Sequence, residues 1–569
     1  MDAISIAKII ENVNKQRGLL FKPIPSCSVK YEAEYSGEID NFGIFKIGFT
    51  KHFPLQIPDI YHEDAKEDFL HTDSLGKLCL VNTSSILIDV DNPSQLVIDC
   101  IDRAIEIVNI HPDSNEYQDE LQREFFSYWG DDDRTVITSI LDTTDVDFKE
   151  YPIMQIKNTW VLAQSQQEAA VFLNNTLNIS INGDYGILQA LVIKLKEGSK
   201  IPTPFGKQKW ISIRQYIEKN SNPSVKSRFQ RYVDQRIRNK FLVLVLILPS
   251  KYGDIMFGFC ISFKNPKLLP MKYSLVNSIS LIDVLRRDYD YLLNRCGAAP
   301  SIKSKQVLLL GCGSIGGFVA NNLCQMGVTI MDILDRDVLT SENVHRHILG
   351  FESLNKYTKN KADLMKQYLE DKYAFVDIDS LNYVDRDVLS FLSEPSKLSN
   401  YDLIISALGE PTVHLEINKL LLQHNIHTPF IICFNEPLGI GGHVILANME
   451  ANSCLRCLYT DAVSGELIPF RGSFVMPEQH FNRSLSGCSG SFVPYSVLDS
   501  QQTAISTSRI AIEVLEGKLM HNQVRSWKGA AGSLLSQGYK LSPVYEDLEG
   551  DFRIVDNFHN DMCPYCRGK

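Results

Sequence analysis

The apolar residues near the start of the chain follow two different spacings. A helical pattern runs to Arg17–Gly18, and strict alternation then predicts half-buried strands around residues 29–35 and 45–49. Helical spacing returns over Pro93–Asn109. A helix, a set of strands and a second helix are typical of an α+β domain, which we place at residues 1–148.

The middle of the chain is rich in short apolar runs that read as buried strands. These runs cover residues 159–163, 186–195, 241–248 and 255–263. A polar, basic insert separates them, and no catalytic constellation is visible, so we predict a mixed linker or scaffold domain over residues 149–272. From residue 273 short apolar strands alternate with helices, which predicts a Rossmann-like, doubly wound α/β domain over residues 273–569.

Composition narrows the class of protein. The chain has 569 residues, 44% of them hydrophobic and 22% charged, with a net charge of −11, as expected for a multi-domain globular protein that binds no nucleic acid. Its longest apolar candidate, Phe241–Leu248, is too short to cross a membrane. The N-terminus lacks the order of a signal peptide, so we expect a cytoplasmic protein. An odd number of cysteines, 13, then favours metal ligands and reactive thiols over disulfides.

A glycine-rich turn follows the apolar strand Gln306–Leu310. The glycines of its GxGxxG pattern are Gly311, Gly313 and Gly316, and a helix follows them. The next predicted strand ends at Asp335, at the spacing of an acid that binds a ribose hydroxyl. Strand, turn, helix and acid together predict a nucleotide site, since backbone N–H groups at a helix start can bind phosphate.

The residues after Asp335 resemble the ubiquitin-activating (E1) enzymes and their bacterial ThiF/MoeB relatives. The resemblance implies ATP with Mg²⁺, the ribose at Asp335 and the phosphates at Asn343, Arg346 and Lys361. Polyphosphate also needs more positive charge and more donors than a dinucleotide does. One departure is Gly409, which stands where the family has a magnesium-binding Asp, with Glu410 as the substitute beside it.

Two CxxC pairs lie about a hundred residues apart. They are Cys454 with Cys457 and Cys563 with Cys566. Two such pairs complete a tetrahedral Zn²⁺ site, which would attach the C-terminal segment to its domain.

Two further cysteines are candidate nucleophiles. Cys488 lies among Ser and Gly residues, where a loop can expose it, and it resembles the E1 cysteine that takes the activated carboxyl as a thioester. Cys79, with His71 upstream and Gly76 three residues before it, resembles the active-site segment of ubiquitin-conjugating (E2) enzymes. The segment departs from that family at Asp73, where an asparagine would stabilise the oxyanion.

An E2-like unit, a linker and an E1-like unit in this order resemble the fused E2–E1 proteins of bacterial CBASS antiphage operons. The resemblance implies that the C-terminus of a cGAS-like nucleotidyltransferase is adenylated and passed through Cys488 and Cys79 to a lysine of a target. It also implies a homodimer.

Three alternatives remain open at the level of sequence. The first is an activating enzyme for a small sulfur- or acyl-carrier protein, with the N-terminal domain used only for docking. The second is an NAD-dependent oxidoreductase, because the glycine turn alone fits NAD as well. The third is a non-catalytic binding protein with a degenerate E2-like fold.

Overall fold

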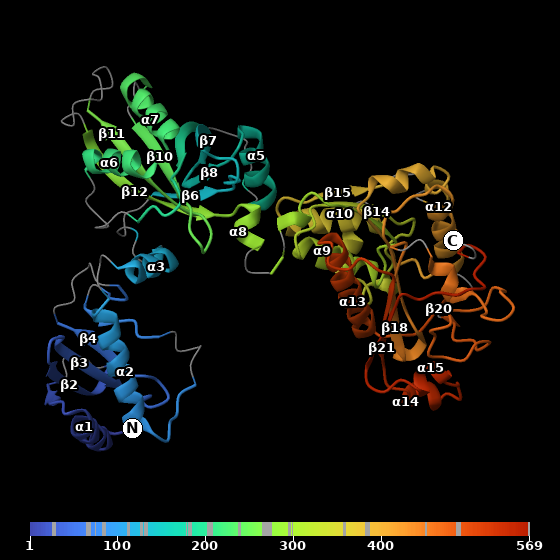
Figure 1. Ribbon diagram of the computed structural model, residues 1–569, viewed down its shortest axis with the longest axis horizontal. Coiled ribbons are helices and arrows are strands. Elements are labelled where there is room, and N and C mark those ends of the chain that lie inside the picture. The colour runs from blue at the N-terminus through green and yellow to red at the C-terminus, as the bar shows by residue number, and fades with distance from the viewer. Residues whose placement is uncertain are drawn as a thin grey trace. The chain divides into compact units, whose positions relative to one another are not determined.

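A computed structural model describes most of the chain. The residues outside its description are 26–29, 64–69, 74, 82–86, 111–113, 126–128, 130–134, 178, 180–184, 202–208, 237–240, 265–275, 294–296, 299, 357–359, 382–386, 450–451, 485–490 and 567–569. The chain divides into two compact units (Figure 1). Unit 1 contains Met1–Gln164 and Gly186–Leu285, and unit 2 contains Ser165–Tyr185 and Arg286–Lys569.

The N-terminal part of unit 1 is an antiparallel sheet that packs with two helices. Helix α1 (Ala3–Arg17) begins where the Asp2 carboxylate accepts a hydrogen bond from Ser5 N, and it ends at Gly18 with φ +67°. Its buried isoleucines share a core with α2 (Pro93–Val108) and with the sheet. The sheet has the order β1-β2-β3-β4-β5, with bounds Lys22–Ile24, Tyr31–Ile39, Gly43–Thr50, Asp59–His62 and Lys77–Leu78.

The two predicted helices and the strands around residues 35 and 47 are confirmed. Tyr35, Phe45, Ile47 and Phe49 are buried on one face of β2 and β3, as the alternation predicts. Strand β2 continues through Ile39, so only residues 40–42 connect it to β3.

The rest of unit 1 is a closed barrel with strand order β10-β11-β12-β6-β8-β7-β9. All seven strands contribute to one core that contains no helix residue and therefore fills the barrel. Helices α3 (Asn115–Arg123), α6 (Trp210–Asn220) and α7 (Pro223–Arg236) contribute to a second core on the outer face. The barrel strands β6 to β12 are Thr135–Ser139, Phe148–Ile156, Thr159–Leu162, Gly186–Lys194, Phe241–Leu248, Ile255–Phe263 and Val276–Arg286.

The position of β10 between two cores explains why its sequence is apolar without interruption. Val243, Val245 and Ile247 belong to the inner core, whereas Leu242, Leu244, Leu246 and Leu248 belong to the outer one. Both faces are buried, so no polar position is available. The barrel also extends beyond the expected linker domain, since β6 lies before residue 149 and β12 lies after residue 272.

Unit 2 is built on an eight-stranded sheet of order β15-β14-β13-β16-β17-β18-β21-β22. The first five strands are parallel, in the arrangement predicted for a doubly wound domain, and the last three are antiparallel. From β13 to β18 the strands are Gln306–Leu310, Ile330–Leu334, Asp377–Ser380, Leu403–Ser406, Phe430–Asn435 and Gly441–Ala447, followed by β21 (Gln523–Lys528) and β22 (Phe552–Asp556).

Helices cover both faces of this sheet. One core joins the sheet to α9 (Gly316–Gln325), α10 (Lys361–Lys372) and α13 (Val497–Leu515), which lie together in Figure 1. The other core contains residues of α11 (Val388–Phe391) and α12 (Pro411–Gln423) together with the four CxxC cysteines. The carboxyl ends of the parallel strands therefore open between two helical layers, where this fold class binds its ligands.

Unit 2 also includes a segment that falls between two barrel strands in the sequence. This segment contains α5 (Gln166–Val171) and η2 (Phe172–Thr176), and η2 contacts α10. Among the described residues, no helix combines the length and the apolar character needed to cross a membrane.

Candidate active site

The glycine turn connects β13 to α9. Gly311 adopts φ +84°, and a Cβ at Gly316 would lie 2.0 Å from the carbonyl oxygen of Gly311. Only glycine allows this close approach of the helix start to the strand end. The turn therefore brings backbone N–H groups to the carboxyl edge of the sheet, as predicted.

Asp335, at the end of β14, is held by the same turn. Its Oδ2 accepts from Cys312 N at 2.8 Å and its Oδ1 accepts from Asp337 N at 2.8 Å. The side chain is buried, and burial raises the pKa of Asp335, while nearby Lys361 opposes that shift. Lys361, at the start of α10, places its Nζ 2.9 Å from Asp337 Oδ2.

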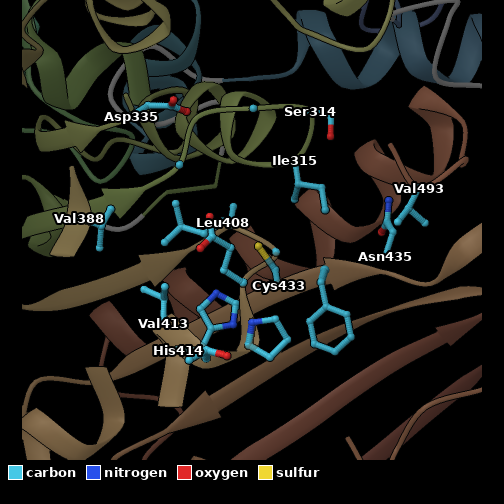
Figure 2. A pocket seen from close by; sticks show the side chains of 18 of the residues that line it. Ser314, Ile315, Asp335, Val388, Leu408, Val413, His414, Cys433, Asn435 and Val493 are labelled. Carbon is cyan, nitrogen blue, oxygen red and sulfur yellow. The ribbon is translucent and has the colours of Figure 1, made fainter. Parts of the chain in front are cut away.

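A cleft of about 910 Å³ joins these residues. Its charged end includes Asp335, Arg346 and Lys361, and Gly311 and Gly313 also line it. Its other end is walled by apolar and aromatic side chains from β17, α12 and the chain around residues 467–470. Figure 2 shows Asp335 and Ser314 on one side of the pocket and His414 on the other, with Cys433 between them.

Two of the predicted nucleotide residues lie outside this lining. Gly316 acts through the close packing of α9 on β13 instead. The amide of Asn343 donates to Thr340 Oγ1 at 3.0 Å. The structure thus groups Gly311, Gly313, Asp335, Arg346 and Lys361 around the cleft.

Two buried histidines belong to this region, and the sequence analysis did not single them out. His347 Nε2 lies 2.6 Å from the carbonyl oxygen of Cys312 and so supports the turn. His414, in the first turn of α12, lines the cleft and is 2% exposed; its Nε2 has no hydrogen-bond partner among the described residues. Burial lowers the pKa of each imidazole to about 4. The signals in the sequence were that His347 directly follows Arg346 and that His414 lies five residues after Gly409.

Gly409 lies at the carboxyl end of β16, where a magnesium-binding Asp was expected by resemblance. Its φ is +70°, a backbone conformation that a residue with a side chain adopts less readily. Glu410 follows it as the N-cap of α12 and lines the cleft. A carboxylate suited to Mg²⁺ is therefore present one residue later.

The four CxxC cysteines come together, as their spacing predicted. The sulfur atoms of Cys454 and Cys563 are 3.8 Å apart, as are those of Cys457 and Cys566. All four sulfur atoms lie within 4.8 Å of one another and are buried. Zn–S bonds of about 2.3 Å in a tetrahedron require S···S separations of about 3.8 Å, so the donor set fits Zn²⁺.

Cys488 lies outside the described residues, but the chain on either side of it is described. Strands β19 (Arg483–Ser484) and β20 (Ser491–Phe492) pair antiparallel. Phe492, Val493 and Tyr495 then line the cleft. The segment that carries Cys488 therefore starts and ends at a hairpin base whose second strand adjoins the charged end of the cleft.

Cys79 lies in unit 1, directly after β5, with an exposed side chain. Its backbone N donates to the carbonyl oxygen of His71 at 2.6 Å. The Asp73 carboxylate accepts from Leu75 N and Lys77 N at 2.8 and 2.9 Å, so it caps the turn before the cysteine. Asp73, which stands where the resembling E2 segment has an asparagine, therefore stabilises this turn through backbone hydrogen bonds.

Comparison with known proteins assigns the class of the enzyme. Residues 294–490 match the ThiF family, and they contain the glycine turn, the cleft cations and the first CxxC pair. The protein is an E1-like enzyme. A match of 22% identity, over 79% of the chain and 80% of the relative, is found with the ATP-dependent ubiquitin transferase-like protein Cap2 of Pseudomonas aeruginosa. The predicted resemblance to ubiquitin-transferase-like proteins is therefore confirmed.

Other relatives of this E1-like enzyme match shorter parts of it. The adenylyltransferase and sulfurtransferase UBA4 of Lodderomyces elongisporus is 26% identical over 29% of the chain and 34% of its own length. A crystal structure of Escherichia coli MccB with MccA-N7isoASN is 14% identical, with a TM-score of 0.34 over 49% of this chain and 71% of MccB. The ThiF match and the sequence similarity to Cap2 and UBA4 support the adenylating class over the NAD-dependent oxidoreductase considered from sequence.

Proposed function

We propose that this E1-like enzyme adenylates the C-terminal carboxylate of a partner protein, carries it as a thioester on Cys488 and then on Cys79, and transfers it to a lysine amine. The observation that carries the proposal is the cleft of unit 2. Its charged end joins Asp335, Arg346 and Lys361 to the base of the hairpin that bears Cys488. An activated carboxyl formed there would lie close to Phe492, four residues after Cys488 in the sequence.

The chemistry divides one difficult step into several easier ones. A carboxylate oxygen attacks the α-phosphorus of ATP, and pyrophosphate leaves. Cys488 Sγ then attacks the acyl carbon and AMP leaves, after which Cys79 Sγ takes the acyl group and frees Cys488. A deprotonated lysine amine finally forms an amide and releases the Cys79 thiolate, which is the logic of covalent catalysis.

The side chains of the cleft suit distinct parts of ATP. Asp335 would bind the ribose, while Arg346 and Lys361 would bind phosphate oxygens, because cations and charge-assisted hydrogen bonds stabilise polyphosphate. Glu410 is our candidate ligand for Mg²⁺. Asn343 is proposed by family resemblance, since it lies outside the lining of the cleft. Zn²⁺ at the four cysteines would serve only to hold the C-terminal segment in place.

The biological setting is proposed from resemblance. The N-terminal sheet and its two helices would form the E2-like transferase, the barrel the linker, and unit 2 the adenylation domain of a homodimer. The partner would be a cGAS-like nucleotidyltransferase and the pathway CBASS antiphage defence in the cytoplasm.

A second candidate is activation of a small sulfur- or acyl-carrier protein, which the UBA4 relative favours. In that case unit 1 would only dock the carrier, and Cys79 would have no covalent role. Both candidates require Cys488.

The two candidates differ in the covalent adducts they leave. We would purify tagged Cys79→Ser and Cys488→Ser proteins from native-host cells and map adducts by mass spectrometry, because a serine oxyester outlives a thioester. The relay predicts an adduct on each introduced serine, through the same partner's C-terminal residue. Cys260→Ser is the matched control, since Cys260 is a half-buried thiol of the barrel.

The outcomes separate the candidates. An adduct at residue 488 alone would reject the relay in favour of carrier activation. An adduct on the Cys260→Ser protein at that serine would show that trapping is non-specific. Absence of ATP–pyrophosphate exchange in the wild-type protein supplied with its co-purified partner would reject both.

A further inference from the structure

Arg346 is held in the cleft by aromatic rings. Its guanidinium carbon lies 4.3 Å from the ring centre of Tyr495 and 5.9 Å from that of Phe492. Among the described residues, no carboxylate lies within ion-pair distance of Arg346, and its buried Nε has no hydrogen-bond partner. A carboxylate partner would compete with an incoming phosphate, whereas an aromatic face orients the cation and leaves its N–H groups available.

Tyr495 also contacts the glycine turn. Its hydroxyl lies 3.1 Å from Ser314 Oγ, within hydrogen-bond distance. Ser314 lies between Gly313 and Gly316 in the turn that approaches the nucleotide. One side chain therefore touches both the phosphate-facing cation and the phosphate-facing turn.

The backbone around Tyr495 is fixed at one end of the hairpin that carries Cys488. The carbonyl oxygen of Pro494 accepts from Leu438 N at 2.6 Å. Ser496, the next residue, is the N-cap of α13 and forms a capping box with Asp499. Strand β20 begins three residues before this fixed backbone, and its Phe492 is the second ring beside the Arg346 guanidinium, so the position of Arg346 acts on β20 directly.

The other arm of the hairpin is attached elsewhere. Arg483 Nη2 donates to Gln537 at 2.5 Å, and the ring of Phe481 packs on Tyr539 with centres 4.5 Å apart. Neither contact reaches a residue that lines the cleft. Among the described residues of the two arms, those that contact Arg346 or the glycine turn are Phe492 and Tyr495, both on the second arm.

We propose that Tyr495 is a positioning residue that couples phosphate binding at Arg346 and Ser314 to the position of the hairpin strand that leads to Cys488. The proposal rests on the proposed function, because it requires ATP in this cleft. Phosphate bound to Arg346 fixes the guanidinium plane and so fixes the ring stacked on it. Coupling is reciprocal, so removal of the ring weakens ATP binding and also frees β20 from the state of the nucleotide.

The test uses the full chain and ATP with Mg²⁺ as the probe. We would measure the ATP dissociation constant by calorimetry and the hydrogen exchange of residues 491–499 with and without ATP. Tyr495→Ala is expected to weaken ATP binding about tenfold and to abolish the ATP-dependent slowing of exchange that the wild-type protein shows. Tyr495→Phe keeps the ring but removes the hydroxyl that contacts Ser314, and Ser314→Ala removes the other partner of the same hydrogen bond. Each variant is expected to weaken ATP binding about threefold. The double variant is expected to weaken it no further, because both substitutions remove one interaction.

Tyr539→Ala is the matched control, since it loosens the other arm without touching the cleft. Its ATP affinity and its ATP-dependent slowing are expected to equal those of the wild type. The proposal would be overturned if Tyr539→Ala and Tyr495→Ala lost the same ATP affinity and the same ATP-dependent slowing of exchange. It would also be overturned if the wild-type protein bound ATP without slower exchange at residues 491–499. Either result would leave the proposed function intact. A wild-type protein that binds no ATP would overturn both.

Discussion

His347 and His414 are buried at the cleft of unit 2 as neutral imidazoles. His347 is 6% exposed and holds the carbonyl of Cys312, and His414 is 2% exposed at the opposite wall. Burial lowers the pKa of both to about 4, since the charged imidazolium loses its solvation. The cleft is therefore built to keep these groups uncharged at neutral pH.

This burial predicts that unit 2 loses stability in mild acid. Between pH 6.5 and pH 4 the unfolded chain binds protons at these histidines and the folded chain does not, so the free energy of unfolding falls as the pH falls through that window. Each histidine contributes a loss of about 2 kcal/mol at pH 5, and the loss levels off below pH 4. Urea unfolding at pH 7, 6 and 5 measures this loss in the free energy of unfolding.

His347→Gln tests the assignment, because glutamine can still donate to Cys312 without titrating. Between pH 7 and pH 5, the free energy of unfolding of the variant is expected to fall by about 2 kcal/mol less than that of the wild type. An unchanged pH dependence would mean that His347 titrates normally in the folded protein.

At the scale of elements, the CxxC pairs join segments that are 109 residues apart in sequence. Cys454 is the N-cap of the short helix η10 (Leu455–Tyr459) and Cys457 lies within it; the first backbone N of this helix donates to Asn418 of α12. Cys563 and Cys566 follow β22, the edge strand of the sheet. A metal at this point would fasten the edge of the sheet to the helical layer.

Loss of that cross-link should destabilise unit 2 and leave unit 1 unchanged. Closing a loop of this length contributes about 4 kcal/mol, which corresponds to a melting temperature lower by about 10 °C. We expect Cys563→Ser to contain no zinc by elemental analysis and to show this shift. Cys260→Ser should keep one zinc per chain, and a zinc-free wild type of full stability would contradict the assignment.

At the scale of the whole molecule, the chain enters unit 2 twice. Residues 165–185 leave the barrel after β8, form α5 and η2 as part of unit 2, and return to the barrel at β9. Phe172 and Leu173 of this segment are buried. Unit 2 is therefore completed by residues that precede its main body by more than a hundred positions.

Truncation of Leu173 should consequently destabilise unit 2. Leu173→Ala removes a fully buried side chain and is expected to cost about 3 kcal/mol, with faster hydrogen exchange in α10. Leu246→Ala, a matched change in the barrel strand β10, should accelerate exchange in β10 and β11 instead. Identical exchange maps for the two variants would refute this division of the chain.

Local sequence was sufficient for much of the fold and part of the site. Alternation at Phe45, Ile47 and Phe49 and helical spacing after Pro93 depend on the backbone periods of strands and helices, which each short segment carries by itself. The glycine turn and Asp335 lie within one strand–turn–helix–strand unit, so their spacing already predicts the nucleotide edge. The CxxC pairs were equally readable, because each pair holds two thiols on one tight turn.

Contacts between distant segments decided the rest. The barrel closes through strands whose order differs from their order in the chain, and residues 165–185 join a unit that lies mainly after residue 286. His414, Tyr495 and Arg346 come from three separate segments, and the sequence around each of them does not predict which residues it contacts. Burial, stacking and a shared cleft arise only when these segments pack together, so only the tertiary structure could show them.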